Sequence, residues 1–393
     1  MLTMNINRNI KVLTWLSFFT DFKLYAPVAI IYFSRVSGSF ALGMSIFSIA
    51  MISSALFEIP TGVFSDKIGR RKTLILGSLS AVIFTIFYAI GTHYWILVIG
   101  AIFEGLSRSF YSGNNDAFLH DTLSESGNKH EYSEFLGKMV SMFQLALAIS
   151  AIAGSAIANV SFSIVMWASV IPQVICLYLG FLSKEPGIRP EESGNIYKHL
   201  KEAISEFKNN KRLRLLSLSS ALTYGVGESL YQFQAAFYNT LWPLWAVGIA
   251  KAISNITAFF SFRYSGKMIK KYSATKLMFV SNIYNRIINM MATLFPNIFS
   301  PLLMSSTSVF FGISTVSRNT LFQKEFTDEK RATMASLNSL LCSIFFGMIS
   351  FLIGFLADKI SPATALFISQ IFLLPSLWMY WKLYKYDKET KLS

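Results

Sequence analysis

The chain has 393 residues, of which 53% are hydrophobic, 15% aromatic and only 14% charged, and its mean hydropathy is +0.47. A soluble domain carries about 25% charged residues, so this composition excludes an ordinary soluble protein and indicates a polytopic membrane protein. The formal net charge of +14 would fit a nucleic-acid partner, but the distribution of the charges argues against one.

Twelve apolar segments are long enough to cross a bilayer, which takes roughly 20 residues. They lie near 11–34, 42–63, 73–91, 94–117, 136–158, 161–182, 214–238, 243–264, 276–295, 298–321, 333–356 and 363–383. The polar interval 183–213 divides them into an N-terminal six-helix bundle (1–182) and a C-terminal six-helix bundle (214–393). Apolar residues recur at helical spacing inside this interval and predict an amphipathic linker helix on the inner membrane surface. The expected fold class is therefore all-α, with twelve transmembrane helices in two pseudo-repeats.

Positive charge lies almost entirely on one side of the predicted spans. With a cytoplasmic amino terminus, 28 of the 35 Lys and Arg residues fall in inner segments and 2 in outer ones. This asymmetry follows the positive-inside rule and places both termini in the cytoplasm. We expect the basic segments to contact anionic lipid and not nucleic acid. Asp21 and Lys23 interrupt the first apolar run, which has no small-residue cleavage site and is predicted to be a retained span.

Ionisable residues inside spans are costly and therefore mark functional sites by default. In a continuous first helix, Asp21, Tyr25, Val28 and Tyr32 would share one face near the midplane. The fourth span carries a polar stripe, which is expected to line a wet cavity. Its members are Glu104, Ser107, Arg108, Tyr111 and Asn115. Glu104 and Arg108 are also spaced to pair along the helix, so a purely structural ion pair is the alternative.

The second half has its own buried polar residues. The seventh span carries Tyr224, Glu228 and Tyr231 on one face, and two nearby glycines would permit a bend. Glu228 is a candidate substrate or proton site, because burial disfavours the charged form of a carboxylate as a proton-coupled carrier requires. The alternative is a structural pair between Glu228 and Lys251 of the eighth span or Arg286 of the ninth. The two cysteines lie in spans and the four histidines lack metal-ligand spacing, so neither a disulfide nor a metal site is expected.

The most informative segment is the short loop between the second and third spans. Its sequence is Gly62-Val-Phe-Ser-Asp66-Lys67-Ile-Gly69-Arg70-Arg71-Lys72. The pattern Gly-x-x-x-Asp-Lys-x-Gly-Arg-Arg-Lys resembles the loop signature of the major facilitator superfamily of secondary transporters. A tight turn that anchors positive charge at the inner surface is the simpler interpretation.

The resemblance implies a function for several of these residues. The loop's Asp66 and Arg70 would join a charge cluster that stabilises the outward-facing state, with Asp121 or Asp116 as the acidic partner. In this superfamily the first, fourth, seventh and tenth spans line the central cavity, and Asp21, Glu104, Arg108 and Glu228 lie on three of them. The resemblance thus implies a transporter and not an enzyme, whose partners are a small-molecule substrate, the proton and membrane lipid. We expect a monomer in the cytoplasmic membrane that uses the proton gradient and no cofactor, since the chain lacks a phosphate-binding Gly-x-x-x-x-Gly-Lys-Ser/Thr run.

The substrate is less well defined. The run Glu58-x-Pro60-x5-Asp66-x3-Arg70-Arg71 resembles the loop of clostridial-type tetracycline efflux proteins, which favours proton-coupled efflux of an amphipathic drug. Two departures argue against a drug antiporter: Ala101 replaces the expected Arg of the fourth span, and 151–158 contains no proline. Transport of a polar or anionic metabolite is the alternative, with a non-transporting membrane sensor or scaffold as the more remote one.

Overall fold

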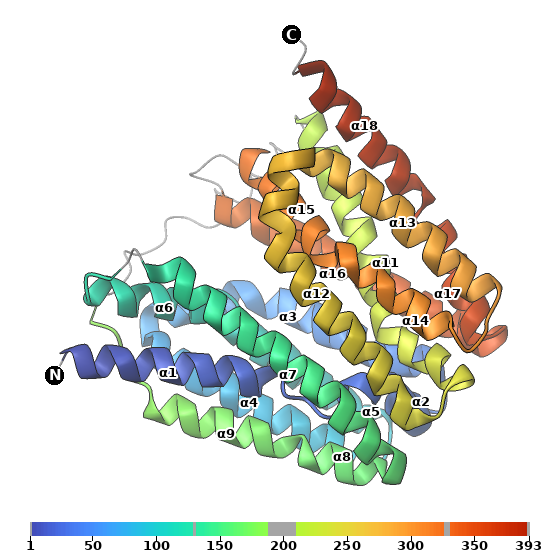
Figure 1. Cartoon of the computed structure of the whole chain (residues 1–393). Helices are drawn as coiled ribbons and strands as arrows, with labels where there is room; N and C mark the ends of the chain where they lie inside the picture. The colour runs from blue at the N-terminus through green and yellow to red at the C-terminus, as the bar shows by residue number, and fades with distance from the viewer. Residues whose placement is uncertain (1, 129–130, 188–209, 326–330, 391–393) are drawn as a thin grey trace. The chain divides into compact units, whose positions relative to one another are not determined.

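The computed structural model describes residues 2–128, 131–187, 210–325 and 331–390, and these residues form helices and connecting loops without a strand (Figure 1). The helices of the first half are α1 (Leu2–Asp21), η1 (Ala26–Val28), α2 (Ala29–Ser37), α3 (Phe40–Ile68), α4 (Arg70–Ile90), α5 (Tyr94–Tyr111), α6 (Asn114–Glu125), α7 (Tyr132–Val160), α8 (Phe162–Ala168) and α9 (Val170–Leu182). Those of the second half are α11 (Lys211–Leu241), α12 (Leu244–Tyr272), α13 (Ala274–Leu294), α14 (Ser300–Ser306), η3 (Thr307–Phe310), α15 (Phe311–Glu325), α16 (Arg331–Lys359), α17 (Pro362–Ile371) and α18 (Leu374–Thr390).

With their short interruptions, the described helices form twelve long segments that match the twelve predicted spans. The predicted all-α class and number of spans are confirmed. Interrupted segments include the first, in which η1 lies between α1 and α2, and the sixth, in which α8 gives way to α9. The expected linker helix falls mainly on 188–209, outside the described residues.

Eight of the described segments are long and apolar enough to be recognised as membrane spans by length and composition. The other four are the segments of α5, α11, α13 and α14–α15. Three of these four carry the intramembrane residues singled out above: Glu104 and Arg108 on α5, Glu228 on α11 and Arg286 on α13. Several candidate functional residues therefore lie on spans that hydropathy does not recognise, whereas Asp21 lies on a span that it does recognise.

The contacts divide the chain into two compact units. Unit 1 comprises Met1–Gly38, Ile49–Ser193 and Leu244–Ala252, and unit 2 comprises Ser39–Ser48, Gly194–Pro243 and Ile253–Ser393. The predicted division into bundles 1–182 and 214–393 stays a prediction, because most of the linker lies outside the described residues.

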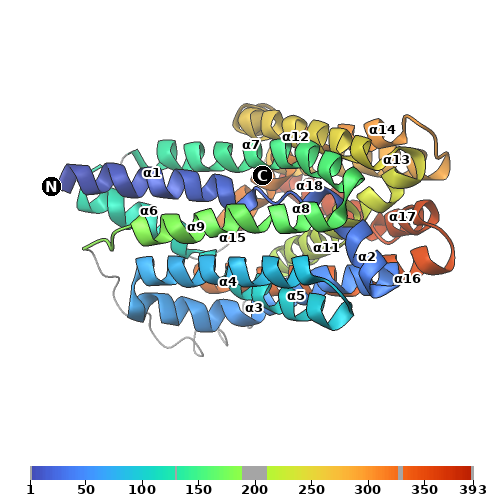
Figure 2. The same ribbon diagram turned by 90° about the horizontal axis from the view of Figure 1, so that it is seen from below.

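Unit 1 is built around α1, α4, α7 and α9. Helix α1 packs against α7 and α9, and α4 packs against α5 and α9 (Figure 2). Large apolar side chains on the outside of the unit are exposed, among them Trp95 at 68% and Val160 at 79%. In a protein that spans a membrane these are the side chains expected to face lipid, so helix association depends on close packing more than on removal of apolar surface from water.

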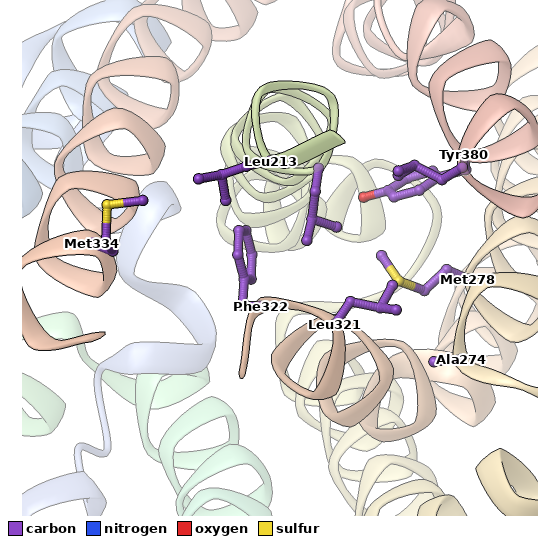
Figure 3. Packing of buried hydrophobic residues seen from close by; sticks show 9 residues of the cluster. Leu213, Ala274, Met278, Leu321, Phe322, Met334 and Tyr380 are labelled. Carbon is purple, nitrogen blue, oxygen red and sulfur yellow. The ribbon is translucent and has the colours of Figure 1, made fainter. Parts of the chain in front are cut away.

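Unit 2 has an apolar cluster between α11, α13, α15 and α18. Leu213, Met278, Leu321, Phe322 and Tyr380 interdigitate there with at most 6% exposure (Figure 3). The Tyr380 hydroxyl donates to the Ser219 carbonyl of α11, so this buried polar group is satisfied within the cluster. The cluster joins α11 and α13, the two helices that carry the predicted polar residues Glu228 and Arg286.

Candidate functional site

The first span is broken in its middle, and Pro27 explains the position of the break. A proline has no N–H for the carbonyl four residues earlier, and its ring collides with that carbonyl. The residue four positions before Pro27 is Lys23. Helix α1 ends two residues before Lys23, at Asp21. The Lys23 carbonyl instead accepts from the Ala26 N–H at 3.0 Å, which opens the single 3₁₀ turn of η1.

Neighbouring helices hold the broken segment in place. The backbone N–H of Tyr25, which would bond to Asp21 in a continuous helix, donates to the Ser169 hydroxyl at 3.1 Å. Ser169 lies at the junction of α8 and α9. On the other side, the Leu24 carbonyl lies so close to Gly154 of α7 that a Cβ there would collide with the oxygen. The break is therefore part of the packed fold and places Lys23 inside unit 1.

Glu104 on α5 is the centre of a buried charge cluster next to this break. Its Oε1 accepts from Arg108 Nη2 at 2.7 Å and lies 3.9 Å from Lys23 Nζ. Its Oε2 accepts from the Tyr88 hydroxyl at 2.8 Å. A buried carboxylate is stable only when its lone pairs are satisfied in this way. We call Lys23, Tyr88, Glu104 and Arg108 the Glu104 cluster.

The Glu104 cluster lies on aromatic side chains. The Tyr88 ring packs edge-on against Tyr25 with centroids 5.7 Å apart, and Lys23 Nζ is 5.3 Å from the centre of the Phe84 ring. Arg108 differs from the other members, because 46% of its side chain is exposed, against 7% for Glu104. The cluster can therefore offer a cationic group and aromatic surface to a ligand while its carboxylate stays fixed.

The break corrects the prediction for the first span. A helical face shared by Asp21, Tyr25, Val28 and Tyr32 is wrong, because the helix ends at Asp21 and resumes as α2 only at Ala29. Pro27 was visible in the sequence and is the signal that would have indicated it. On α5 the spacing argument holds for Glu104 and Arg108, which do pair. Tyr111, the last residue of α5, lies apart from the pair and donates to the Ser78 hydroxyl at 2.9 Å.

A second cluster, which we call the loop cluster, surrounds the loop between α3 and α4 and includes Ser65, Arg70, Asn114 and Asp121. Arg70 Nε lies 3.3 Å from Asp121 Oδ2, and both side chains are largely buried, at 13% and 14% exposure. Arg70 Nη1 also donates to the Ser65 hydroxyl, and the Asn114 amide donates to the Arg70 carbonyl at 3.2 Å. Of the two predicted acidic partners, Asp121 is the one that pairs with Arg70.

Glu185 completes the loop cluster and was not expected from the sequence. Its Oε1 and Oε2 accept from the backbone N–H groups of Arg70 and Arg71 at 2.6 and 2.8 Å. A carboxylate at this place satisfies two of the unpaired donors of the α4 amino terminus and complements its dipole. Gly69 has φ of +98°, and a Cβ there would lie 2.6 Å from the Glu185 carboxylate, so glycine meets both the conformational and the steric requirement.

The other predicted loop residues lie on α3 and α4, on either side of Gly69. Gly62 and Lys67 are exposed on α3, and the Arg71 guanidinium donates to the Phe181 carbonyl of α9 at 3.1 Å. Asp66 belongs to α3, but its side chain lies outside what the structure describes.

In unit 2 the predicted residues do not form one cluster of charges. Glu228 accepts from the Gln232 amide one turn along α11 at 2.8 Å, and the Tyr231 hydroxyl donates to Asn255 at 3.4 Å. Tyr224 lies one turn before Glu228, and α11 runs unbroken through the two glycines that were expected to permit a bend. Gly225 instead allows the backbone of α16 at Phe345 to approach closely. Arg286 does not pair with Glu228; its guanidinium donates to the side-chain oxygen of Gln370 on α17.

Tyr88, Ser169, Glu185 and Gln370 are the contacts that the sequence did not indicate. Tyr88, Ser169 and Gln370 have no charged residue three or four positions away, and Glu185 lies outside any helix, so only the partner in another segment reveals the role of each. No group of three or more His, Cys, Asp or Glu side chains that could hold a metal ion occurs in the part of the chain that the structure describes.

Comparison with known proteins supports a transporter architecture. The Major Facilitator Superfamily model matches residues 12–347. The uncharacterized MFS-type transporter YxaM of Bacillus subtilis is 21% identical over 363 residues, which cover 88% of this chain and 90% of that protein. The uncharacterized MFS-type transporter MJ1560 of Methanocaldococcus jannaschii is 23% identical over 388 residues, with 93% and 96% covered.

Among solved structures, a mutant form of the nucleoside transporter NupG superimposes with a TM-score of 0.84 over 96% of this chain and 100% of that one, at 12% identity. That likeness shows the fold alone. The family and its relatives are transporters and not enzymes. The chain is a multi-pass membrane protein that belongs to the Major Facilitator Superfamily and has its twelve-helix architecture.

Proposed function

We propose that the protein is a proton-coupled secondary transporter that exports an amphipathic small molecule across the cytoplasmic membrane by alternating access. The observation that carries the proposal is the Glu104 cluster, which combines a half-exposed arginine with aromatic side chains beside a broken helix. Ionisable residues at membrane depth mark substrate and ion pathways. Membership of a transporter family gives this cluster its context.

In this proposal the residues of the Glu104 cluster have separate roles. Arg108 binds a polar or anionic group of the substrate, and the aromatic side chains of Tyr25 and Phe84 contact its apolar part. Glu104, which is held by Arg108, Lys23 and Tyr88, is the fixed counter-charge and stays ionised. Asp21 at the end of α1 and Glu228 on α11 carry the protons, because neither acid is paired with a cation of its own helix.

The loop cluster serves as the inner gate. Its support is the pairing of Arg70 with Asp121, together with the two bonds from Glu185 to the amino terminus of α4. Both contacts join segments that are more than 50 residues apart in the chain. Relative movement of α4 and α6 would have to break the pair between Arg70 and Asp121. The excess of Lys and Arg in the same set of segments supports an inner location for this loop and both termini. We propose that one chain suffices for transport.

The test is accumulation of tetracycline and of a cationic dye in efflux-deficient bacteria, with and without a protonophore. Cells that express the chain should accumulate less of at least one compound, and both Asp121→Asn and Glu228→Gln should abolish this difference. Glu134→Gln is the matched control, because Glu134 is exposed and pairs only with Lys138 one turn away. Export that persists in both variants would refute the roles proposed for Asp121 and Glu228. Accumulation equal to that of empty cells, with the protein present in the membrane, would refute drug export.

Transport of an anionic metabolite is the second candidate function. It is favoured by the exposure of Arg108, whose guanidinium can bind a carboxylate while it keeps its bond to Glu104. The resemblance of the loop to tetracycline efflux proteins favours the first candidate. Uptake of radiolabelled organic acids into vesicles separates the two, since a metabolite carrier should take up at least one acid and lose that uptake in Arg108→Gln, whereas a drug exporter should take up none.

A further inference from the structure

Arg286 is a buried cation in unit 2. It lies on α13 at 6% exposure, and Asn282 and Asn289 lie on the same face, also buried. A guanidinium cannot lose its charge in a protein, so its burial requires compensation from its surroundings.

The surroundings that the structure describes provide an amide and not a carboxylate. Arg286 Nη1 donates to Gln370 Oε1, and no salt bridge reaches Arg286 among the described residues. Arg286 Nε is buried without a hydrogen-bond partner, as is Nε2 of Gln370, a residue with 0% exposure. One contacting pair thus presents two unused N–H donors and one uncompensated positive charge.

The two asparagines on the same face of α13 carry further unused polar atoms. The Asn282 and Asn289 amide groups donate to their own helix, at the Met278 and Asn285 carbonyls, and both Oδ1 atoms are buried without partners. Buried polar groups are nearly always satisfied, and several unsatisfied ones in one place indicate a bound species. Water can satisfy donors and acceptors, but it does not neutralise a buried charge.

We propose that Arg286 and Gln370 form an anion-binding site, in which a halide, carboxylate or phosphate group accepts from Arg286 Nε and Gln370 Nε2. Asn282 and Asn289 accept from a water or hydroxyl that accompanies the anion. The anionic group belongs either to a transported molecule or to a free inorganic ion. The site goes beyond the proposed function, since binding at Arg286 requires neither export nor a proton gradient.

The experiment measures thermal unfolding of the full-length protein in detergent, titrated separately with sodium chloride, acetate and phosphate at constant ionic strength. Wild-type protein should be stabilised by at least one of them, by about 3 °C or more at saturation. Arg286→Gln should abolish the shift. Arg263→Gln is the matched control, because it removes an exposed arginine of the same unit and should leave the shift unchanged.

Gln370→Glu keeps the test decisive if Arg286→Gln fails to fold. It places a carboxylate against the guanidinium at almost unchanged volume, so the variant should unfold at a higher temperature without added anions and should no longer respond to them. A shift with chloride alone assigns the site to a halide, a shift with phosphate but not acetate assigns it to a phosphate group, and a shift with acetate assigns it to a carboxylate group. No shift in the wild type, or equal shifts in the wild type, Arg286→Gln and Gln370→Glu, would overturn the proposal and leave water as the partner. Transport is not part of this readout, so failure of the export assay has no bearing on it.

Discussion

Glu104 in unit 1 and Arg286 in unit 2 are both buried charges on helices that are too polar to be recognised as spans by hydropathy. The two residues differ in how their charge is compensated. Glu104 has two cations and a tyrosine around one carboxylate. Arg286 has one amide and keeps an unpartnered N–H. Both residues belong to helices that pack against several neighbours, so the difference lies in the side chains and not in the depth of burial.

A buried charge can be stabilised by other residues of the chain or left for a ligand. A charge that is neutralised internally is expected to act as a fixed part of the structure, because breaking it leaves partners uncompensated. A charge that lacks a counter-ion is expected to respond to what the solution supplies. Substitutions at contacts of decreasing strength test this distinction.

The largest effect is expected from Glu104→Gln. The variant removes the shared carboxylate and leaves Lys23 and Arg108 without their counter-charge, which should lower the free energy of unfolding by about 3–5 kcal/mol. It should also abolish transport. Thermal unfolding in detergent and flux in vesicles measure the two effects.

Glu104→Gln in an Arg286→Gln background tests whether the two units differ in their response to anions. Unit 1 then carries the uncompensated cations, so sensitivity to acetate or chloride should reappear in the double variant. If the double variant is insensitive to anions, the two units do not differ in the way described here.

Gly154→Ala tests the break in the first span. The added Cβ would collide with the Leu24 carbonyl oxygen, which the bonds of the broken segment hold in place, so the variant should be destabilised by about 3 kcal/mol. Gly137→Ala on the same helix has nothing within 4 Å and should stabilise the protein by about 0.5–1 kcal/mol. Equal behaviour of the two variants in thermal unfolding would show that the Leu24 segment is not held against α7.

Tyr88→Phe removes one contact of Glu104 and keeps the aromatic packing. A hydrogen bond to a charged group contributes about 1.5–3 kcal/mol, and this loss should appear as a lower unfolding temperature with reduced transport. Tyr32→Phe is the comparison, because its hydroxyl donates to the neutral Tyr88 carbonyl at 2.8 Å and should contribute about 1 kcal/mol. A larger effect at Tyr32 would argue that Glu104 does not depend on Tyr88.

The smallest effect is expected from Glu185→Ala, which removes the two bonds to the amino terminus of α4. Loss of a helix cap costs about 1 kcal/mol, and Glu185 is exposed, so solvent replaces part of the interaction. Glu131→Ala at the start of α7 is the control, since Glu131 makes no side-chain cap bond and its loss should change stability by less than about 0.5 kcal/mol. Equal unfolding temperatures for the two variants would contradict a capping role for Glu185.

Much of the fold could be predicted from the sequence, because each span is a local property of about 20 consecutive residues. The same holds for the pairing of Glu104 with Arg108, which depends only on helical spacing. The face assigned to Tyr25 was wrong because it assumed a continuous helix where Pro27 breaks one. The competing pairs proposed for Glu228 could not be ranked, since spacing along one helix carries no information about which residue of another helix lies opposite.

Hydropathy, charge asymmetry and a local pattern were enough to predict the membrane class, the twelve spans, the one-sided distribution of positive charge and the family signature at Gly62–Lys72. The three-dimensional arrangement was needed to show that Arg70 pairs with Asp121, that Glu185 caps α4, that Tyr88 bonds Glu104 and that Arg286 contacts Gln370 and not an acid. The physical reason is that each of these contacts acts over a few ångströms between segments that are distant in the chain or on different helices, and their strength depends on burial that no local pattern records.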